Sequence, residues 1–265
     1  MKNPTILVLA GRRHGRLDPL ASARSLTHKC VVPVSGNAMI AHVLETIRDT
    51  FPEARILVSI EDFSAIADVP IVAELTTSGR LMPVEAQHNL VESVARAAEI
   101  ATFPLLITTA DNVLLTAEAI TAMLDTATSA DAVVALARKE QIMQAHPAGK
   151  NRYYEFSNGG FSNCNLFLLR DRHALRAAEP FREGGQFLKV KGRILKTFGL
   201  TSALMFQSGL FSLERMFKQI SGRIGVRVKP LVLNDGRLAI DVDDEASLVA
   251  VESILARQHA ALVPG

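Results

Sequence analysis

A glycine followed by basic residues stands almost at the start of the chain, in the stretch ILVLAGRRHGRLDPLA of residues 6–21. An apolar run ends at Ala10, Gly11 follows, and Arg16 and Lys29 come soon after. A glycine-bearing loop after a buried strand lets backbone N–H groups approach phosphate oxygens closely. Arg16 and Lys29 could then neutralise the charge on those phosphates. The residues alone leave a second interpretation open, which is a solvated basic loop.

The same stretch could belong to a dehydrogenase, because LAGRRxxRL occurs in short-chain dehydrogenases on the strand that follows a glycine-rich turn. Here it stands on the first strand, and Gly11 and Gly15 form no G-x-G-x-x-G motif. The Tyr-x-x-x-Lys pair of those enzymes is also missing after both Tyr153 and Tyr154. These differences exclude the dehydrogenase interpretation.

Aspartates follow apolar runs at two further places. Asp111 comes directly after FPLLITTA, and the carboxyl ends of strands are where open α/β sheets bind ligands. Asp241 and Asp243 alternate in AIDVDDEASL, which on a short strand points both side chains to one side. Asp244 is expected to cap the last helix. Asp111 and Asp241 could each instead be a turn residue.

The elements that must position these side chains alternate between strand and helix. Continuous apolar runs predict buried strands, and apolar residues at helical spacing predict the helices between them. The strands are expected at residues 5–10, 54–60, 103–110 and 131–137, and the helices at 38–49, 89–101 and 116–127. This alternation predicts an α/β protein, a three-layer α/β/α fold with a mostly parallel central sheet.

After about Pro147 the pattern changes. Residues 153–169 predict a strand, a Gly-Gly turn and a second strand, and a helix-rich insertion is expected at about 180–222. Strands at 226–233 and 237–242 and a helix at 245–260 are expected to close the chain. No low-complexity linker or internal repeat divides the sequence, so we expect one domain over residues 1–265.

Composition narrows the class of protein. The formal net charge of +2 over 265 residues does not indicate binding to nucleic acid. Cys30 and Cys164 show no metal-ligand spacing, which favours a reduced compartment. Arg12 and Arg13 stand where a signal peptide would be cleaved, and no apolar stretch is long enough to span a bilayer. We therefore expect a soluble cytoplasmic protein, whose oligomeric state the sequence does not indicate.

Three sequence blocks occur in the order of a known family. The LAG loop with Lys29 and HKCVVPVSGNAMIAHVLE comes first, LLITTADN follows, and AIDVDDEASLVAVESIL comes last. This order resembles the nucleotidyltransferases with the Rossmann-like GT-A (nucleotide-diphospho-sugar transferase) fold. More narrowly, it resembles the MobA-like NTP transferases, which include molybdenum-cofactor guanylyltransferase and sugar- or polyol-phosphate cytidylyltransferases. The chain departs from the family pattern where Arg12 and His14 replace two glycines.

The resemblance implies roles for residues around the nucleotide. Arg16 and Lys29 would be catalytic, acting on the α-phosphate and the departing pyrophosphate. The nucleotide-binding residues would be Leu9, Ala10, Gly11, Arg12, Arg13, Asn89, Glu92 and Ser93. Asn89 and Ser93 could instead be ordinary caps of the helix that begins there.

The resemblance also implies a metal site and an acceptor site. Asp111 would bind Mg²⁺, or Mn²⁺ in its place, together with Asp243 from across the site. The acceptor-binding residues would be Gly159, Gly160, Asn163 and Asn165. A hairpin turn with ordinary, satisfied amides is the alternative for these four residues.

The implied function is transfer of a nucleoside monophosphate from an NTP, with CTP or GTP favoured, to a phosphorylated small acceptor. Two alternatives stay open. A GT-A glycosyltransferase that uses a nucleotide sugar is disfavoured by the triphosphate-type loop and by TADN in place of D-x-D. A non-catalytic nucleotide-binding module is suggested by the altered glycines. The insertion could be a lid over the acceptor, a contact with an anionic membrane surface, or a packed subdomain.

Overall fold

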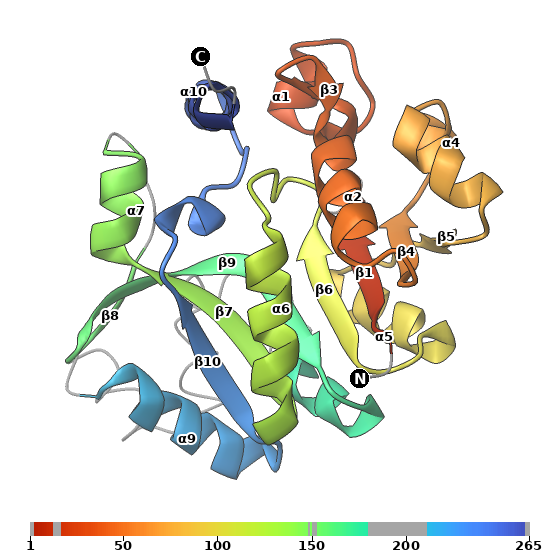
Figure 1. Cartoon of the computed structure of the whole chain (residues 1–265). Helices are drawn as coiled ribbons and strands as arrows, with labels where there is room; N and C mark the ends of the chain where they lie inside the picture. Colours follow the sequence, from red (N-terminus) through yellow and green to blue (C-terminus); the bar gives the residue numbers. More distant parts are fainter. Residues whose placement is uncertain (1–2, 13–16, 148, 150–152, 180–210, 263–265) are drawn as a thin grey trace.

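The computed structural model describes residues 3–12, 17–147, 149, 153–179 and 211–262 (Figure 1). The strands are β1 (Thr5–Leu9), β2 (Pro33–Val34), β3 (Asn37–Ala38), β4 (Arg55–Ile60), β5 (Leu81–Glu85), β6 (Leu105–Thr109), β7 (Ala132–Arg138), β8 (Tyr154–Phe156), β9 (Gly159–Leu169) and β10 (Val228–Leu233). The helices are α1 (Pro19–Ser22), α2 (Met39–Thr50), α3 (Ser64–Ala67), α4 (Pro70–Thr77), α5 (Leu90–Ile100), α6 (Ala117–Thr126), α7 (Lys139–Ala145), α9 (Leu213–Ile224) and α10 (Glu245–Leu262). Short 3₁₀ helices lie at Lys29–Val31, Ala127–Ser129, Arg172–Ala177 and Gly236–Ala239.

The main sheet is mixed and mostly parallel. Its strands lie in the order β10-β7-β9-β6-β1-β4-β5, and β8 pairs with β9. β1 runs parallel to β4 and β6, β4 to β5, and β7 to β10. β9 runs antiparallel between β6 and β7. The predicted α/β class and mostly parallel sheet are confirmed, and the hairpin after Pro147 supplies the antiparallel strand.

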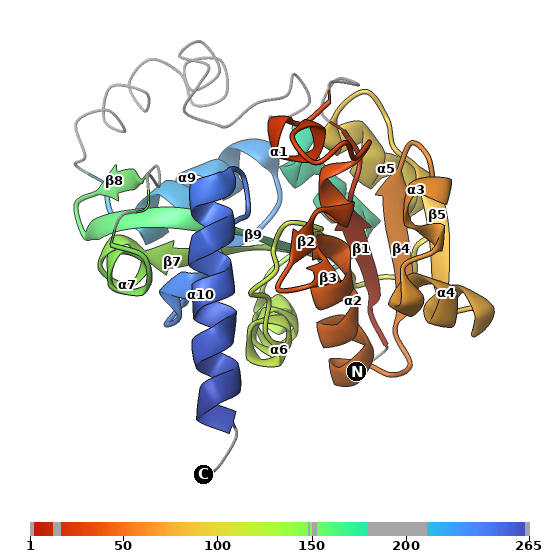
Figure 2. The same cartoon turned by 90° about the horizontal axis from the view of Figure 1, so that it is seen from above.

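Helices cover both faces of this sheet, as Figure 2 shows. On one face, α2 and α6 share a hydrophobic core with β1, to which Ile40, Ile120 and Ile6 belong. On the other face, α5 packs through Val94 against Leu7 of the same strand. Because successive side chains of a strand point to opposite faces, the apolar run of β1 is buried on both sides. The three predicted layers are therefore present.

Two expectations for the second half of the chain are wrong in detail. The β8–β9 turn lies at Ser157–Asn158, so Gly159 and Gly160 are the first residues of β9. The strand expected at 237–242 is replaced by the 3₁₀ helix Gly236–Ala239 and by extended chain that belongs to no strand. Asp235 caps this helix by accepting a hydrogen bond from the backbone N–H of Arg237 (3.0 Å), so local capping overrides the apolar pattern.

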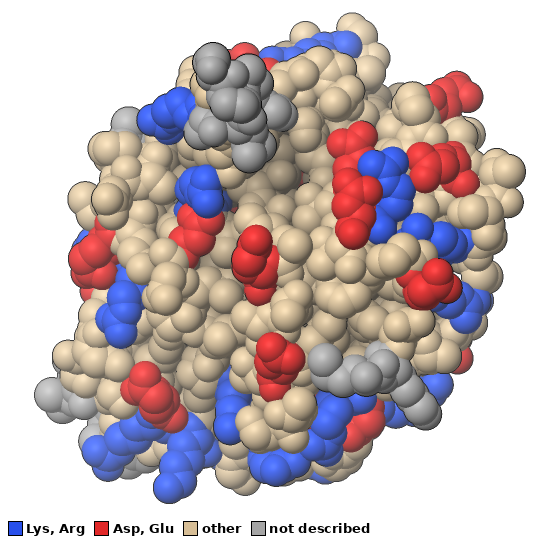
Figure 3. All heavy atoms as spheres, viewed as in Figure 1, with Lys and Arg blue, Asp and Glu red and all other residues tan. Residues whose placement is uncertain are grey.

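The expected insertion is only partly within the described residues. Residues 180–210 lie outside them, whereas α9 packs on the sheet through Phe217 and Ile220. None of the helices in the described part of the chain is long and apolar enough to cross a membrane. On the face seen in Figure 3, acidic side chains are scattered, and several basic side chains gather along its lower rim.

Asp131, just before β7, joins segments at the end of the sheet away from the carboxyl ends of its parallel strands. Its carboxylate accepts hydrogen bonds from the backbone N–H (2.8 Å) and Nη2 (2.9 Å) of Arg227. It also pairs with Nη2 of Arg170 at 2.5 Å. The hydrogen bonds from Arg227 lower the pKa of Asp131 to about 2.

We expect Asp131→Asn to lower the free energy of unfolding at pH 7 by about 1–2 kcal/mol, allowing for solvent screening. Because the pKa is depressed in the folded state from 3.8, the stabilisation is present above about pH 4 and is lost as the pH falls toward 2. Urea unfolding of both proteins should show the difference at pH 7 and a smaller one near pH 3. Asp125→Asn, at an exposed position of α6, is the control. Equal stability of wild type and Asp131→Asn at pH 7 would contradict this prediction.

Candidate functional site

The carboxyl ends of β1 and β6 meet the segment around Val242 at the end of the sheet where the parallel strands finish. The backbone N–H of Ala110, after β6, donates to the carbonyl of Leu9 at the end of β1 (3.0 Å). The backbone N–H of Val242 donates to the carbonyl of Asp111 (3.4 Å). Figure 1 shows α1 and α10 at the edge toward which β1 and β6 point. This edge therefore gathers the ends of all three sequence blocks.

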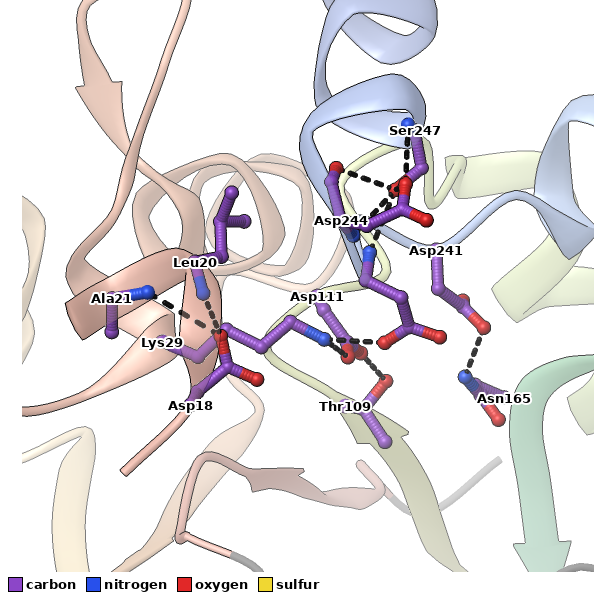
Figure 4. Close-up of polar contacts among 11 residues, drawn as sticks. Asp18, Leu20, Ala21, Lys29, Thr109, Asp111, Asn165, Asp241, Asp244 and Ser247 are labelled. Atoms are coloured by element: carbon purple, nitrogen blue, oxygen red, sulfur yellow. Dashed lines mark hydrogen bonds and ion pairs between the residues drawn. The ribbon is translucent and has the colours of Figure 1, made fainter. Parts of the chain in front are cut away.

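Lys29 lies between two of the predicted metal ligands. Its Nζ is 2.6 Å from Oδ2 of Asp111 and 2.6 Å from Oδ1 of Asp243 (Figure 4). Although burial lowers the pKa of Lys29, the charges of Asp111 and Asp243 outweigh it and raise that pKa well above its usual range. The Lys29 side chain is therefore a charged ammonium group that forms ion pairs with two carboxylates.

Asp111 is oriented from its own strand end. Thr109 Oγ1 donates to Oδ1 of Asp111 at 2.5 Å. The next residue, Asn112, is buried, and its Nδ2 donates to Thr108 Oγ1 (3.1 Å) and to the carbonyl of Cys164 on β9 (3.1 Å). Sequence reasoning missed Thr109 and Asn112, although both lie within two residues of a predicted ligand.

Asp241 brings a third carboxylate to the same place. Asn165 Nδ2 donates to its Oδ2 at 2.7 Å, while its Oδ1 is buried and has no hydrogen-bond partner among the described residues. Burial, followed by the charges of Asp111 and Asp243, raises the pKa of Asp241. Val242, between Asp241 and Asp243, is fully buried. Asp243 and Asp111 share Lys29, and Asp241 lies beside them, although neither Asp241 nor Asp243 belongs to a strand (Figure 4).

The side chains at this place suit a divalent cation in charge and ligand type. Asp241 Oδ1 is a buried oxygen without a partner, and the Lys29 ammonium marks a place for positive charge between Asp111 and Asp243. Carboxylate oxygens are the ligands that Mg²⁺ prefers. Among the residues that the structure describes, no three His, Cys, Asp or Glu side chains form a group that could hold a metal ion as they stand. The carboxylates of Asp111, Asp241 and Asp243 thus fit Mg²⁺ in ligand type and charge, while the Lys29 ammonium lies between Asp111 and Asp243.

The expected phosphate loop begins beside this cluster. The backbone N–H of Arg12 donates to Oε1 of Glu61, which follows β4 (2.6 Å). A Cβ on Gly11 would lie only 2.8 Å from the Cβ of Ala86, which follows β5. Arg13 and Arg16 lie outside the described residues. Sequence reasoning missed Glu61, yet it follows a buried strand as Asp111 does.

We expect Gly11→Ala to raise the KM for the nucleotide by on the order of ten-fold, because an added methyl group must displace the loop or Ala86, and overpacking costs about 1–3 kcal/mol. Steady-state kinetics with varied NTP would measure this change. Gly222→Ala in α9 is the matched control, since a Cβ there meets nothing within 4 Å. An unchanged KM in Gly11→Ala would show that the loop does not need glycine.

At the start of α5, two of the predicted nucleotide-binding residues form hydrogen bonds to the backbone. Asn89 Oδ1 accepts from the backbone N–H of Glu92 (2.9 Å) and caps the helix. Ser93 is buried, and its Oγ accepts from the backbone N–H of Gln87 (2.8 Å). Capping is therefore present at Asn89, and nucleotide binding by Asn89, Glu92 and Ser93 stays a prediction.

The four predicted acceptor residues divide into two groups along β9. Asn163 Nδ2 donates to Asn165 Oδ1 (3.1 Å), and Asn165 in turn contacts Asp241, so both amides adjoin the carboxylates. Gly159 lies six residues before Asn165, which is about 20 Å along a strand. Gly159 and Gly160 therefore lie apart from Lys29 and the carboxylates that it contacts. Their contact with an acceptor stays a prediction.

Solved structures of transferases share this fold. A hypothetical transferase from Thermus thermophilus superposes with a TM-score of 0.75 at 24% identity, covering 93% of this chain and 99% of that one. A CMP:2-keto-3-deoxy-manno-octonic acid synthetase in complex with CTP gives a TM-score of 0.59 at 11% identity, with 96% and 99% covered. A putative glucose-1-phosphate thymidylyltransferase from Bacillus anthracis gives 0.57 at 14% identity, with 98% and 97% covered.

The sequence comparisons address the family directly. No curated protein matches the chain significantly. The family model for the MobA-like NTP transferase domain matches residues 6–188, which is well over half of the chain and includes Lys29, Asp111 and Asn165. The chain therefore belongs to the MobA-like NTP transferases and is a nucleotidyltransferase.

Proposed function

We propose that this enzyme transfers a nucleoside monophosphate from an NTP, with CTP or GTP favoured, to a phosphorylated small acceptor and releases pyrophosphate. The observation that carries the proposal is the Lys29 ammonium held by Asp111 and Asp243 at 2.6 Å each. It lies at the carboxyl edge of the sheet, where open α/β sheets bind their ligands. The family supplies the NTP as donor.

We propose that Asp111 and Asp243, with Asp241 beside them, hold Mg²⁺, or Mn²⁺ in its place. When bound, the ion supplies positive charge that neutralises the phosphates. Thr109 orients Asp111 through its hydrogen bond to Oδ1 (2.5 Å). The unpartnered Oδ1 of Asp241 supports its inclusion as a third ligand.

The protein's part in the reaction is positioning and charge neutralisation. An acceptor phosphate oxygen forms a bond to the α-phosphorus while the bond to the bridging oxygen of the β-phosphate breaks, and pyrophosphate leaves. Lys29 and Arg16 stabilise the charge that develops on these oxygens, and no protein nucleophile is needed. The role of Arg16 rests on the resemblance alone.

The loop that follows β1 and the strand β9 complete the proposed site around Lys29, Asp111 and Asp243. We place the triphosphate on the loop Leu9, Ala10, Gly11, Arg12 and Arg13, and the acceptor along β9. We also propose that residues 1–265 act as one domain in the cytoplasm.

Pyrophosphate release tests the reaction. We expect release from one NTP in the presence of one class of sugar or polyol phosphate, and loss of release when EDTA removes the divalent metal. Glycosyl transfer from a finished nucleotide sugar would contradict the proposal. So would the absence of pyrophosphate release across the whole panel of NTPs and acceptors.

A further inference from the structure

β9 is interrupted where it passes the carboxylates. On β7, Val134 pairs with Phe167 but Leu136 pairs with Asn163, so the register of the two strands shifts between these pairs. Asn165 lies within the interruption and has a φ of +47°, a left-handed conformation that asparagine tolerates better than most residues. Bulges of this kind re-aim side chains next to active sites. Here the bulge turns Asn165 toward the closing segment of the chain.

Hydrogen bonds fix which end of the Asn165 amide faces Asp241. The backbone N–H of Asn165 donates to Oδ1 of Asn163 (3.2 Å), so the other end of the Asn163 amide, Nδ2, must face Asn165. That Nδ2 donates to Oδ1 of Asn165 (3.1 Å). The remaining group of Asn165, its Nδ2, therefore faces Asp241 and donates to Oδ2 (2.7 Å).

We propose that Asn165 is a positioning residue, which holds Asp241 by one oxygen so that the other can bind the metal ion. This inference rests on the proposed function. The Asn165 Nδ2 only donates and a carboxylate oxygen accepts, so this contact occupies Oδ2 of Asp241 and leaves Oδ1 available to the ion. Asp241 Oδ1 is left without a partner, beside the charges of Asp111 and Asp243 (Figure 4).

The same hydrogen bonds give Asn165 a role beside its predicted contact with the acceptor. Its Oδ1 and one hydrogen of its amide are already engaged by Asn163 and Asp241. Thr109 likewise holds one oxygen of Asp111, because its Oγ1 donates to Oδ1 of Asp111 at 2.5 Å. Partners that orient metal ligands typically change metal affinity by about 10–100-fold when they are removed.

Asn165→Asp is the sharpest test. Aspartate has nearly the same shape and also tolerates the left-handed backbone, but it replaces the amide donor with a second carboxyl group, whose charge repels that of Asp241. We expect Mn²⁺ affinity, measured by electron paramagnetic resonance with inorganic triphosphate present, to fall about 10–100-fold. Asn165→Gly removes the amide without straining the backbone, and we expect a similar loss.

Asn158→Asp is the matched control on the same hairpin. It adds the same charge seven residues away. Its Oδ1 can still accept from the backbone N–H of Leu213 (3.0 Å), and, as at Asn165, the substitution removes an amide that donates to a carboxylate, here that of Glu214 (3.1 Å). We expect wild-type Mn²⁺ affinity in this control. All three variants should unfold cooperatively, with a lower midpoint where the new carboxylate faces Asp241 or Glu214. Equal loss in Asn158→Asp would overturn the inference, because the effect would then come from charge alone.

A second readout needs no metal. In the wild-type protein, we expect the side-chain amide signal of Asn165 in nuclear magnetic resonance spectra to be protected from solvent exchange. Asp241→Ala, which removes the acceptor of this hydrogen bond, should remove the protection, whereas Asp243→Ala should leave it in place. Protection that persists in Asp241→Ala would overturn the contact between Asn165 and Asp241.

The outcomes separate this inference from the proposed reaction. Wild-type Mn²⁺ affinity in both Asn165→Asp and Asn165→Gly overturns the positioning role, even if pyrophosphate release is found. Weakened Mn²⁺ binding without pyrophosphate release from any NTP supports the positioning role and contradicts the reaction. A wild-type protein that binds no Mn²⁺ with triphosphate contradicts both.

Discussion

Asp111→Asn should abolish turnover, with kcat falling by three orders of magnitude or more, about 4 kcal/mol in the barrier. The substitution removes the charge that is proposed to hold the metal ion and that now contacts Lys29 at 2.6 Å. The fold should be retained, because Asp111 follows β6 and is only half-buried, and an asparagine Oδ1 can still accept from Thr109. Pyrophosphate release at saturating Mg²⁺ measures the effect, and urea unfolding checks the fold.

Asp125→Asn serves as the control, since this exposed carboxylate of α6 takes no part in the cluster. We expect it to keep wild-type kcat. Wild-type-like kcat in Asp111→Asn at saturating Mg²⁺ would show that Asp111 is not a metal ligand.

Lys29→Met should lower kcat by about 10²–10³-fold, or about 2–4 kcal/mol, the typical effect of removing one donor that stabilises transition-state charge. The variant should also bind Mn²⁺ more tightly than wild type when no nucleotide is present. The reason is that the ammonium and the metal ion compete for the same oxygens of Asp111 and Asp243. Single-turnover kinetics and Mn²⁺ titration measure the two effects.

Lys229→Met on β10 is the control, because this exposed lysine contacts Ser129 and no residue of the site. Normal kcat in Lys29→Met would remove Lys29 from the catalytic residues. Mn²⁺ affinity that stays at the wild-type value would show that the lysine and the metal ion do not share a position.

Local sequence patterns determined the elements that carry the site. The apolar runs that form β1, β4, β6 and β7 are continuous, which leaves few alternatives to strands buried on both faces. The position of Asp111 follows directly, because a polar residue after such a strand must lie at its carboxyl end. The order of the blocks around Lys29 and Asp243 likewise sufficed to indicate the family.

Elements with weaker patterns were not predicted. β5 buries Leu81 and Val84 but exposes Met82 and contains Pro83, as suits a strand that among the described residues lies at the end of the sheet, beside β4. Glu61 was missed for a different reason, since one carboxylate after a strand says nothing about which loop it will contact.

Only the tertiary structure decided how the site is assembled. Lys29 and Asp111 are 82 positions apart, Lys29 and Asp243 are 214 apart, and Asn165 and Asp241 are 76 apart. Sequence periodicity describes which face of one element is buried, whereas these contacts depend on strand order and on the bulge in β9. The sequence by itself determined which charged residues stand at strand ends. The packing of β9 between β6 and β7 decided that an asparagine amide reaches Asp241, because only that strand order brings β9 to the carboxylates.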